Sequence, residues 1–339
     1  MSNKMPSNPS IDTGAVPLVE FWRGDILESL HRGHAVVMRP TGEIVESWGQ
    51  ADAVIYPRSS CKMVQALPLL ESGAGRDLLP EQLALACASH QGAEIHVARV
   101  AKWLADIGLG ETDLRCGCQD PQDIAQRDHL IKTDRQPCQL HNNCSGKHAG
   151  FLTLNRHLGG DPEYTLPDHP VQQAVRQAFE EVTGMTSPGF GVDGCSAPNF
   201  ATSLSALAFA MAQFAAASES GDGRSRAMTA LREAMIQHPE LVAGETRACT
   251  DLMRAMGGHA AIKTGAEAVF VAILPQQGLG IALKIVDGGV RAAEAAITAL
   301  LIRHGVLSPE HPIVPKYLGP LYSRRGLHAG HVCTAPGFA

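Results

Sequence analysis

The sequence predicts a mixed α/β fold of the α+β kind, in which both chain ends form one antiparallel sheet and a largely helical part is inserted between them. Near the start, runs at 16–21, 35–38 and 44–48 have strand character, and a Pro-Thr-Gly-Glu turn separates the last two. Near the end, β-branched runs at 268–274 and 280–286 are separated by Gln-Gln-Gly. Hairpins pair their strands antiparallel, so the simplest arrangement joins both hairpins in one sheet.

The middle of the chain has the spacing and composition of helices. Pro80, Pro121 and Pro170 stand near expected first turns, where proline is tolerated. One more helix, at 291–304, follows the second hairpin and is expected to pack on the sheet. The helices predicted in the middle are 61–70, 80–88, 94–107, 120–132, 148–156, 170–182, 203–217 and 225–237.

These elements predict one catalytic region, 16–339, behind a flexible tail. The tail, 1–15, is polar and rich in Ser, Asn and Pro. The sheet portion is expected at 16–58 and 260–305, and the mainly helical portion at 59–259.

Composition excludes several classes of function. The net charge is −6 and no basic block is present, which argues against nucleic-acid binding. The apolar stretch 204–217 is broken by Ser205 and Gln213, so no membrane span is expected. The start lacks the charged-then-apolar order of a signal peptide, and we expect a cytoplasmic protein. Its nine cysteines are then expected to be thiols rather than disulfides.

The first chemical motif is Ser59-x-x-Lys62 at the start of a predicted helix. Residues three apart share one face of a helix, so the lysine can take the serine proton if its own pKa is lowered. Backbone N–H groups at a helix start can also stabilise an oxyanion. Taken alone the tetrapeptide is common, and Ser59 could simply cap the helix.

A second motif, Lys263-Thr-Gly265, precedes the strand at 268–274. Ser-x-x-Lys on a helix with Lys-Thr-Gly on a strand is typical of serine β-lactamases and penicillin-binding proteins. Gly265 is expected to leave room for a substrate. The middle motif of that pattern, Ser-Asp-Asn, is absent; Ser89 is the best candidate to pair with Lys263, although alone it could be an ordinary loop residue.

Two loop cysteines suggest a metal site. Cys144 and Cys195 lie in stretches of small and polar residues, and Lys147 is close to the first. Zinc binds thiolates in tetrahedral sites, and a neutral lysine is a rare third ligand. The alternative is that both cysteines are small buried residues.

Longer stretches of the chain resemble the rhizobial-type (class 3) L-asparaginases. The resemblance extends over nearly the whole chain after the tail. Ala268 stands where it implies a glycine. The stretches that carry it are 16–24, 56–67, 143–150, 192–200 and 262–267.

The resemblance implies a serine β-lactamase/glutaminase-like fold, a homodimer, and hydrolysis of the small molecule L-asparagine to L-aspartate and ammonia. It implies that Ser59 is the nucleophile with Lys62 as its base, and that Ser89 and Lys263 form a second Ser–Lys tandem. It implies a zinc ion (Zn2+) that helps to bind and orient the substrate. The implied metal ligands are Cys144, Lys147 and Cys195, and the implied substrate-binding or supporting residues are Arg58, His148, Asp193 and Cys249.

Two alternatives remain open from the sequence. One is another hydrolase of the same fold, such as a glutaminase, since one methylene contributes only about 1–3 kcal/mol of discrimination. The other is a non-catalytic amino-acid sensor. The presence of Ser59, Lys62, Ser89 and Lys263 together argues against a pure binder.

Overall fold

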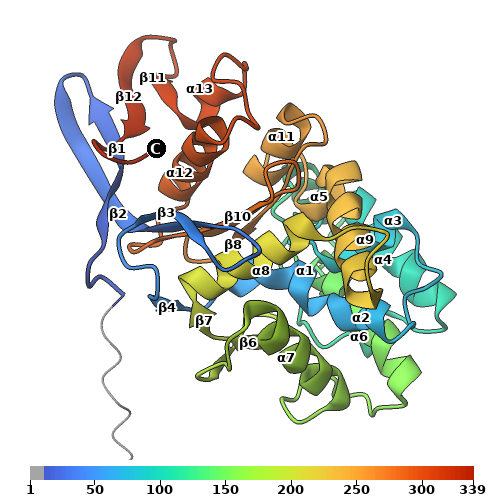
Figure 1. Ribbon diagram of the computed structural model, residues 1–339. Helices are drawn as coiled ribbons and strands as arrows, with labels where there is room; N and C mark the ends of the chain where they lie inside the picture. The colour runs from blue at the N-terminus through green and yellow to red at the C-terminus, as the bar shows by residue number, and fades with distance from the viewer. Residues whose placement is uncertain (1–10) are drawn as a thin grey trace, which may run out of the picture.

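A computed structural model describes residues 11–339, and its centre is an eight-stranded antiparallel sheet (Figure 1). The order is β11-β12-β1-β2-β10-β9-β8, with β3 also paired to β2. Strand β2 pairs with β10, so the two chain ends share one sheet, as predicted. The strands are β1 (Val16–Arg23), β2 (Ile26–Met38), β3 (Ile44–Trp48), β8 (Ala261–Gly265), β9 (Val269–Leu274), β10 (Leu279–Ile285), β11 (Gly319–Tyr322) and β12 (His328–Thr334).

The middle of the sheet is buried on both faces. Every residue of β9 and β10 is buried, which an antiparallel strand shows only when both faces are covered. Helix α8 (Leu204–Ala216) and helix α12 (Val290–Arg303) pack on these strands. A Cβ at Gly280 would stand 2.1 Å from the backbone nitrogen of Ala212, so glycine is what lets α8 approach β10.

The remaining helices pack beside the sheet, on the right in Figure 1. They are η1 (Arg58–Cys61), α1 (Lys62–Gln65), α2 (Leu67–Glu71), α3 (Pro80–Ala86), α4 (Glu94–Asp106), η2 (Glu111–Asp113), α5 (Ile124–Lys132), η3 (Gln139–His141), α6 (Ser145–Leu158), α7 (Pro170–Thr183), α9 (Gly223–Gln237), α10 (Pro239–Val242) and α11 (Ala248–Ala255). Short strand pairs β4 (Val54–Ile55) with β7 (Thr202–Ser203), and β5 (Phe190–Val192) with β6 (Pro198–Phe200), lie at the junction. No helix among residues 11–339 is long and apolar enough to cross a membrane.

Two predictions about element boundaries are wrong. The sheet portion does not end at 305, because α13 (Val314–Tyr317) is followed by β11 and β12, and β12 pairs with β1. The pattern of β12 is weak because the strand is half exposed and contains Gly330. The predicted helix 61–70 is divided into η1, α1 and α2, and Pro68 lies in the first turn of α2, where it can donate no backbone hydrogen bond.

The predicted tail, 1–15, lies partly outside the described residues. Its last five residues are attached to the sheet, since His34 Nε2 lies 2.8 Å from the carbonyl of Ile11 and Arg32 donates to the carbonyl of Ala15 at 2.7 Å. Polar composition alone does not show such backbone contacts.

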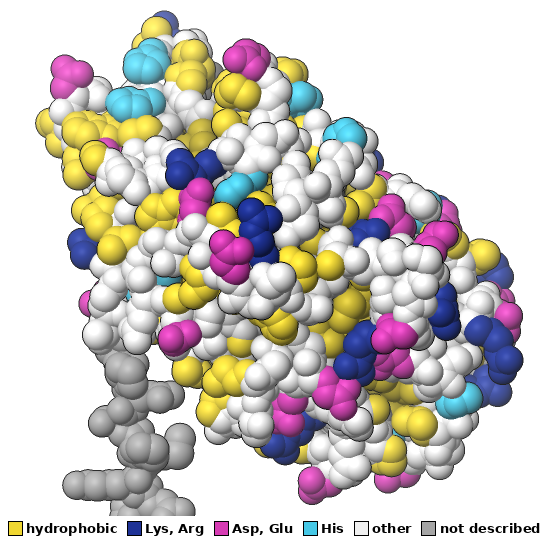
Figure 2. Space-filling view, in the orientation of Figure 1, with side chains coloured by type: hydrophobic (Ala, Val, Ile, Leu, Met, Phe, Trp, Pro, Cys, Tyr) yellow, Lys and Arg dark blue, Asp and Glu magenta, His cyan; other side chains and the backbone are white. Residues whose placement is uncertain are grey.

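The surface carries both signs of charge without a basic stripe on the face that Figure 2 shows. Hydrophobic side chains gather at the upper left of that view, over the β1–β2 hairpin. Ile26, Leu27 and Leu30 of this hairpin are 73%, 40% and 41% exposed. This apolar hairpin surface (Ile26, Leu27, Leu30) is distant in sequence from the motifs.

Candidate active site

Ser59 lies in η1, at the point where the chain leaves the sheet for the helical part. Arg58, just before it, has a φ of 53°, a left-handed conformation that is uncommon for a residue with a side chain. The hydroxyl of Ser60 is buried and donates to the carbonyl of Pro57 at 2.7 Å. Ser59 is partly exposed instead, and no hydrogen bond joins its hydroxyl to another group in the described chain. Of the two serines, Ser59 is therefore the accessible one.

Strand β8 packs directly against η1. A Cβ at Gly265 would stand 2.5 Å from the carbonyl oxygen of Pro57 and 3.1 Å from the nitrogen of Ser60. The role expected for Gly265 was room for a substrate; in the structure it gives room for η1. The close packing still brings the Lys263-Thr264-Gly265 strand beside Ser59, as the two motifs predict.

Lys62 is buried and connects three elements. Its ammonium donates to the carbonyl of Ala88, to Ser89 Oγ at 3.0 Å and to Cys144 Sγ at 3.1 Å. The serine bonded to Lys62 is thus Ser89, whereas the sequence pairs Lys62 with Ser59. Among the described residues, neither predicted pair, Ser59 with Lys62 or Ser89 with Lys263, is joined by a hydrogen bond.

Lys263 is fully buried on β8, and its Nζ donates to the carbonyl of Thr264 at 2.9 Å. The pKa of Lys263 is lowered to about 7, chiefly by burial; the positive charges of Lys62 and Arg247 act in the same sense, against an opposing effect of Cys249. A lysine with this pKa is half neutral near pH 7, so it can accept a proton. No hydrogen bond joins it to Ser89 in the part of the chain described.

The three predicted metal ligands lie together. Lys147 Nζ donates to Cys195 Sγ at 3.2 Å, and both cysteines are buried. A hydrogen bond from Cys144 holds the pKa of Cys195 well below its usual range, with Lys147 and His148 acting in the same sense against burial. The same contact and burial raise the pKa of Cys144. The pair is therefore one thiol and one thiolate beside a cationic amine.

This donor set fits a zinc ion in its chemistry. Between residues 11 and 339, no group of three or more His, Cys, Asp or Glu side chains is placed to hold a metal ion, so Lys147 stays the predicted third ligand beside the two cysteines. His148 Nδ1 lies 2.8 Å from the hydroxyl of Tyr164, while its buried Nε2 has no hydrogen-bond partner. Its ring is close enough to Cys195 to interact with that charge. A buried imidazole nitrogen without a partner is an additional donor beside the two sulfurs.

Arg58 and Asp193 form a half-buried ion pair at the edge of this cluster. Arg58 donates to Asp193 Oδ1 from Nε at 3.2 Å and from Nη2 at 2.8 Å. Burial opposes ionisation of Asp193, but the bond from Arg58 holds its pKa below the usual range. Arg58 is therefore occupied by a partner within the protein.

Cys249, the last predicted supporting residue, lies on the other side of the site. Its buried Sγ accepts the N–H of Thr264 at 3.3 Å, which connects α11 to β8. Burial raises the pKa of this thiol. Cys249 thus stays a neutral neighbour of Lys263.

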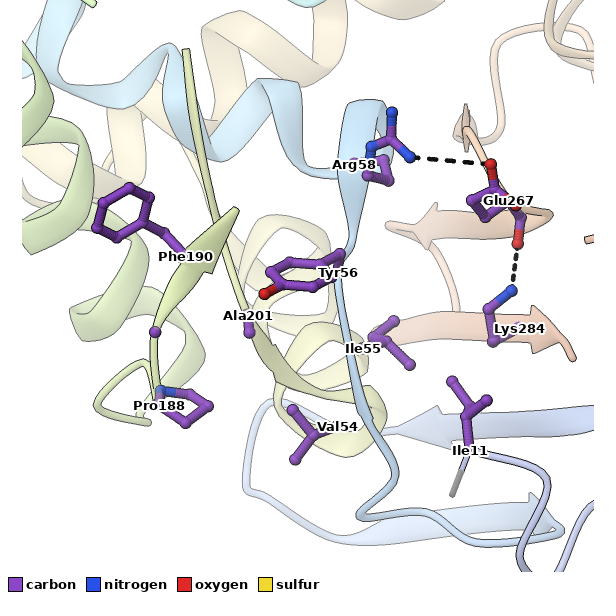
Figure 3. A pocket seen from close by; sticks show the side chains of 11 residues that line it. Ile11, Val54, Ile55, Tyr56, Arg58, Pro188, Phe190, Ala201, Glu267 and Lys284 are labelled. Carbon is purple, nitrogen blue, oxygen red and sulfur yellow. Dashed lines mark hydrogen bonds and ion pairs between the residues drawn. The ribbon is translucent and has the colours of Figure 1, made fainter. Parts of the chain in front are cut away.

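A pocket of about 440 Å³ opens beside Arg58. Figure 3 shows Arg58 and Glu267 at one end, Lys284 near Glu267, and Tyr56 and Ile55 along the wall. Glu267 Oε1 is 4.0 Å from Arg58 Nη1. Ser59, Lys62 and Lys263 do not line this pocket, whereas Arg58 lines it and is also bonded to Asp193 at the edge of the buried cluster.

Three residues of this region were not predicted. Asn143 Oδ1 accepts from Cys144 Sγ at 2.9 Å, and Tyr164 positions His148. Arg247 is close enough to Lys263 to act on its pKa. Asn143 and Arg247 lie within two residues of Cys144 and Cys249, which is a signal that could have been used. Tyr164 has none, because only the fold brings its loop to His148.

Comparison with solved structures finds similarity to Mglu in its glutamate form, with 14% identity over 82% of this chain and 62% of that one, at a TM-score of 0.48. The chain thus spans about three fifths of that protein. A beta-lactamase from Mycobacterium bovis is 13% identical over 81% of this chain and 95% of that one, at 0.41. The D-alanine carboxypeptidase AmpC from Burkholderia cenocepacia is 13% identical over 80% and 93%, also at 0.41.

Among proteins of curated function, none matches the chain. The sequence model of the family described as L-asparaginase II matches residues 19–333, from the first strand of the sheet to its last. That match includes every motif discussed above, and the chain belongs to the L-asparaginase II family.

Proposed function

We propose that this protein is an L-asparaginase of the rhizobial type, which hydrolyses L-asparagine to L-aspartate and ammonia through a serine ester. The observation that carries the proposal is the buried contact of Lys62 with Ser89, beside Lys263 with its pKa of about 7 and next to the accessible Ser59. A lysine that is partly neutral at working pH can activate a serine hydroxyl. Membership in an asparaginase family supports the substrate class.

In the proposed mechanism, Ser59 Oγ attacks the side-chain amide carbon of asparagine. In the proposal Lys62 first loses its own proton to solvent; the neutral amine then takes the proton of Ser59 and passes it on through Ser89, to which Lys62 is bonded. The tetrahedral intermediate collapses, the C–N bond breaks, and the nitrogen leaves as ammonia after taking this proton. Water then adds to the β-aspartyl ester and gives a proton to neutral Lys263. The ester C–O bond breaks, aspartate is released, and Lys263 returns that proton to Ser59 Oγ.

Ser89 is the second candidate nucleophile. The observation that favours it is that Ser89, not Ser59, is hydrogen-bonded to a lysine in the structure. It is only 7% exposed, which makes approach of a substrate carbon harder than at Ser59.

We also propose that Cys144, Lys147 and Cys195 hold zinc. Bound there, the ion would supply a Lewis-acidic positive charge next to Lys62, which donates to Cys144, and polar groups of the substrate could bind to it. Asn143 contacts the ligand Cys144, and Tyr164 positions His148 beside the three ligands.

A homodimer in the cytoplasm completes the proposal. The apolar hairpin surface (Ile26, Leu27, Leu30) supports association, since exposed apolar side chains in one place are typical of an interface. The measurement is the molar mass in solution. A monomer at all concentrations contradicts this part alone.

The activity is tested by ammonia release from L-asparagine, with L-glutamine and a chromogenic cephalosporin in parallel. We expect rapid release from asparagine by the wild type and a loss of at least about 10³-fold in Ser59→Ala, because no other accessible hydroxyl replaces the nucleophile. Mass spectrometry of quenched reactions locates the acyl group. A +115 Da adduct on the peptide of Ser89, or near-normal turnover by Ser59→Ala, contradicts the assignment to Ser59; turnover of glutamine alone overturns the substrate.

A further inference from the structure

Arg247 is fixed beside the Lys263 strand. It is the N-cap residue of α11, two residues before Cys249. The thiol of Cys249 accepts the N–H of Thr264 at 3.3 Å, and α11 packs on β8. The backbone of Arg247 is therefore anchored next to the strand that carries Lys263.

The side chain of Arg247 reaches toward the Ser89 loop. Its Nη1 donates to Gln122 Oε1 at 2.8 Å, and the N–H of Gln122 donates to the carbonyl of Gln91 at 2.8 Å. Gln91 is two residues after Ser89. The guanidinium thus lies between the Ser89 loop and β8, and its charge contributes to the lowered pKa of Lys263.

The charge of Arg247 has no ion-pair partner. Among residues 11–339, no carboxylate lies within 4.0 Å of its guanidinium, and its side chain is bonded to a neutral amide instead. Glu294 of α12 is the nearby carboxyl group; burial raises its pKa, and Arg247 acts against that rise without forming an ion pair. Asp251 is occupied by Lys316 and Tyr317. Arg247 is also partly exposed, so its free N–H groups are open to a ligand.

Arg58 differs in this respect. Two of its N–H groups are bonded to Asp193 and a third faces Glu267 at 4.0 Å. A substrate carboxylate at Arg58 would have to displace Asp193 or tolerate its charge. At Arg247 the substrate carboxylate would become the ion-pair partner that this side chain lacks. A guanidinium binds a carboxylate with two parallel hydrogen bonds.

We infer that Arg247 binds the α-carboxylate of the substrate and so selects amides of α-amino acids. The inference rests on the proposed hydrolysis of an amino-acid amide at the Ser–Lys cluster. With its carboxylate held between the Ser89 loop and β8, the substrate directs its side-chain amide toward Lys62 and the serines. Amides that lack the carboxylate lose this contact.

The test uses three amides: L-asparagine, succinamate without the α-amino group, and 3-aminopropanamide without the carboxylate. In Arg247→Gln, kcat/KM is expected to fall roughly 30–1,000-fold for the two carboxylates, mainly through KM, and by less than about 3-fold for 3-aminopropanamide. Arg247→Lys, which keeps the charge without the planar fork, should recover part of the loss. Arg254→Gln is the matched control on α11, because Arg254 is already paired with Glu245 on the surface.

An equal loss on all three amides overturns the inference, since it would mean that Arg247 acts through Lys263 or through stability. If the wild type cleaves glutamine but not asparagine, the two analogues become glutaramate and 4-aminobutanamide. The test is then again whether Arg247→Gln loses kcat/KM on the amides with a carboxylate and keeps it on the amide without one. If it cleaves no amide, the proposed function fails separately, and calorimetry decides on Arg247. L-aspartate should then bind the wild type and Arg254→Gln at least about 10-fold more tightly than Arg247→Gln, and equal binding or none overturns the inference.

Discussion

Lys263 and Lys147 are both buried in the same site, yet their pKa values are shifted in opposite directions. They are 0% and 3% exposed. Burial lowers the pKa of Lys263 to about 7. Burial also acts to lower the pKa of Lys147, but the negative charge of Cys195, to which Lys147 donates, reverses the effect, and the net shift of the pKa is upward.

The neighbours explain the difference. Lys263 is surrounded by the charges of Lys62 and Arg247 and by the thiol of Cys249, which remains protonated. Lys147 donates to Cys195 at 3.2 Å. One side of the site thus favours a neutral amine suited to proton transfer, and the other favours an ammonium paired with a thiolate.

The largest expected effect is on the reaction itself. Lys263→Met should lower kcat by about 10²–10⁴-fold, the range for loss of a general base, and Lys263→Arg should not restore it because arginine keeps its proton. Wild-type kcat/KM should decline below pH of about 7 as Lys263 becomes protonated. The measurement is the steady-state pH profile of each variant.

Lys284→Met is the matched control for that substitution. Lys284 is also buried with a lowered pKa, but its ammonium is bonded to the carbonyls of Glu267 and Ile285, away from the serines. We expect its kcat to stay within about 3-fold of the wild type. If both variants lose activity alike, the loss comes from an unpaired or missing buried lysine in general, not from a base.

The sequence predicts the elements of the site better than the contacts between them. The packing of η1 on β8 places Ser59 beside the strand of Lys263, as the two motifs predict, whereas Ser89 has no motif of its own and was only the best candidate to pair with Lys263. The catalytic roles of these residues stay predictions. That Lys62 bonds to Ser89 could not be predicted, because it depends on where the loop after α3 meets α6. Arg247 was missed for the same reason, since its position depends on α11, β8 and Gln122 together.

In the fold, too, local patterns predict some elements, whereas others depend on contacts between distant parts of the chain. Strong apolar runs such as β9 and β10 predict the antiparallel sheet and its origin in both chain ends. Strand β12 was missed because it borders the sheet through half-exposed residues, and its partner β1 lies about 300 residues away in sequence. Ala268 shows how local expectation can mislead: its φ of 57° is what a glycine would favour, yet alanine adopts it in the turn after β8.

A smaller effect is expected on metal binding. Lys147→Met should weaken zinc binding by about 10–100-fold, whereas Lys263→Met should leave it unchanged, because only Lys147 lies among the thiols. Cys195→Ser should weaken binding at least as much. Zinc titration by calorimetry in two buffers measures the affinity and the protons released by the ligands. Equal affinity in the wild type and Lys147→Met would remove Lys147 from the site.

The smallest effect is on stability and has a defined direction with pH. Because the folded protein holds the Lys263 proton less tightly than the unfolded chain, the unfolded state binds more protons between pH of about 7 and the ordinary lysine value of 10.5. The free energy of unfolding is therefore reduced by Lys263 as the pH falls from 10.5 to about 7, because the unfolded chain gains the proton first. Above pH 10.5 this loss of stability is absent. Lys263→Met should melt about 2–4 °C above the wild type at pH 7, and the gap should narrow by pH 9.5.

Lys147→Met provides the contrast that decides the interpretation. A raised pKa keeps the contribution of Lys147 fully present below the ordinary lysine value, so from pH 7 to 9.5 it should not change. That variant also leaves the Cys195 thiolate without its ammonium partner, and it should melt below the wild type throughout. Melting curves of all three proteins across this range are the measurement. If the difference in Tm between Lys263→Met and the wild type is constant from pH 7 to 9.5, Lys263 titrates as an ordinary lysine. The conclusion that the pKa values of the two lysines are shifted in opposite directions would then be wrong.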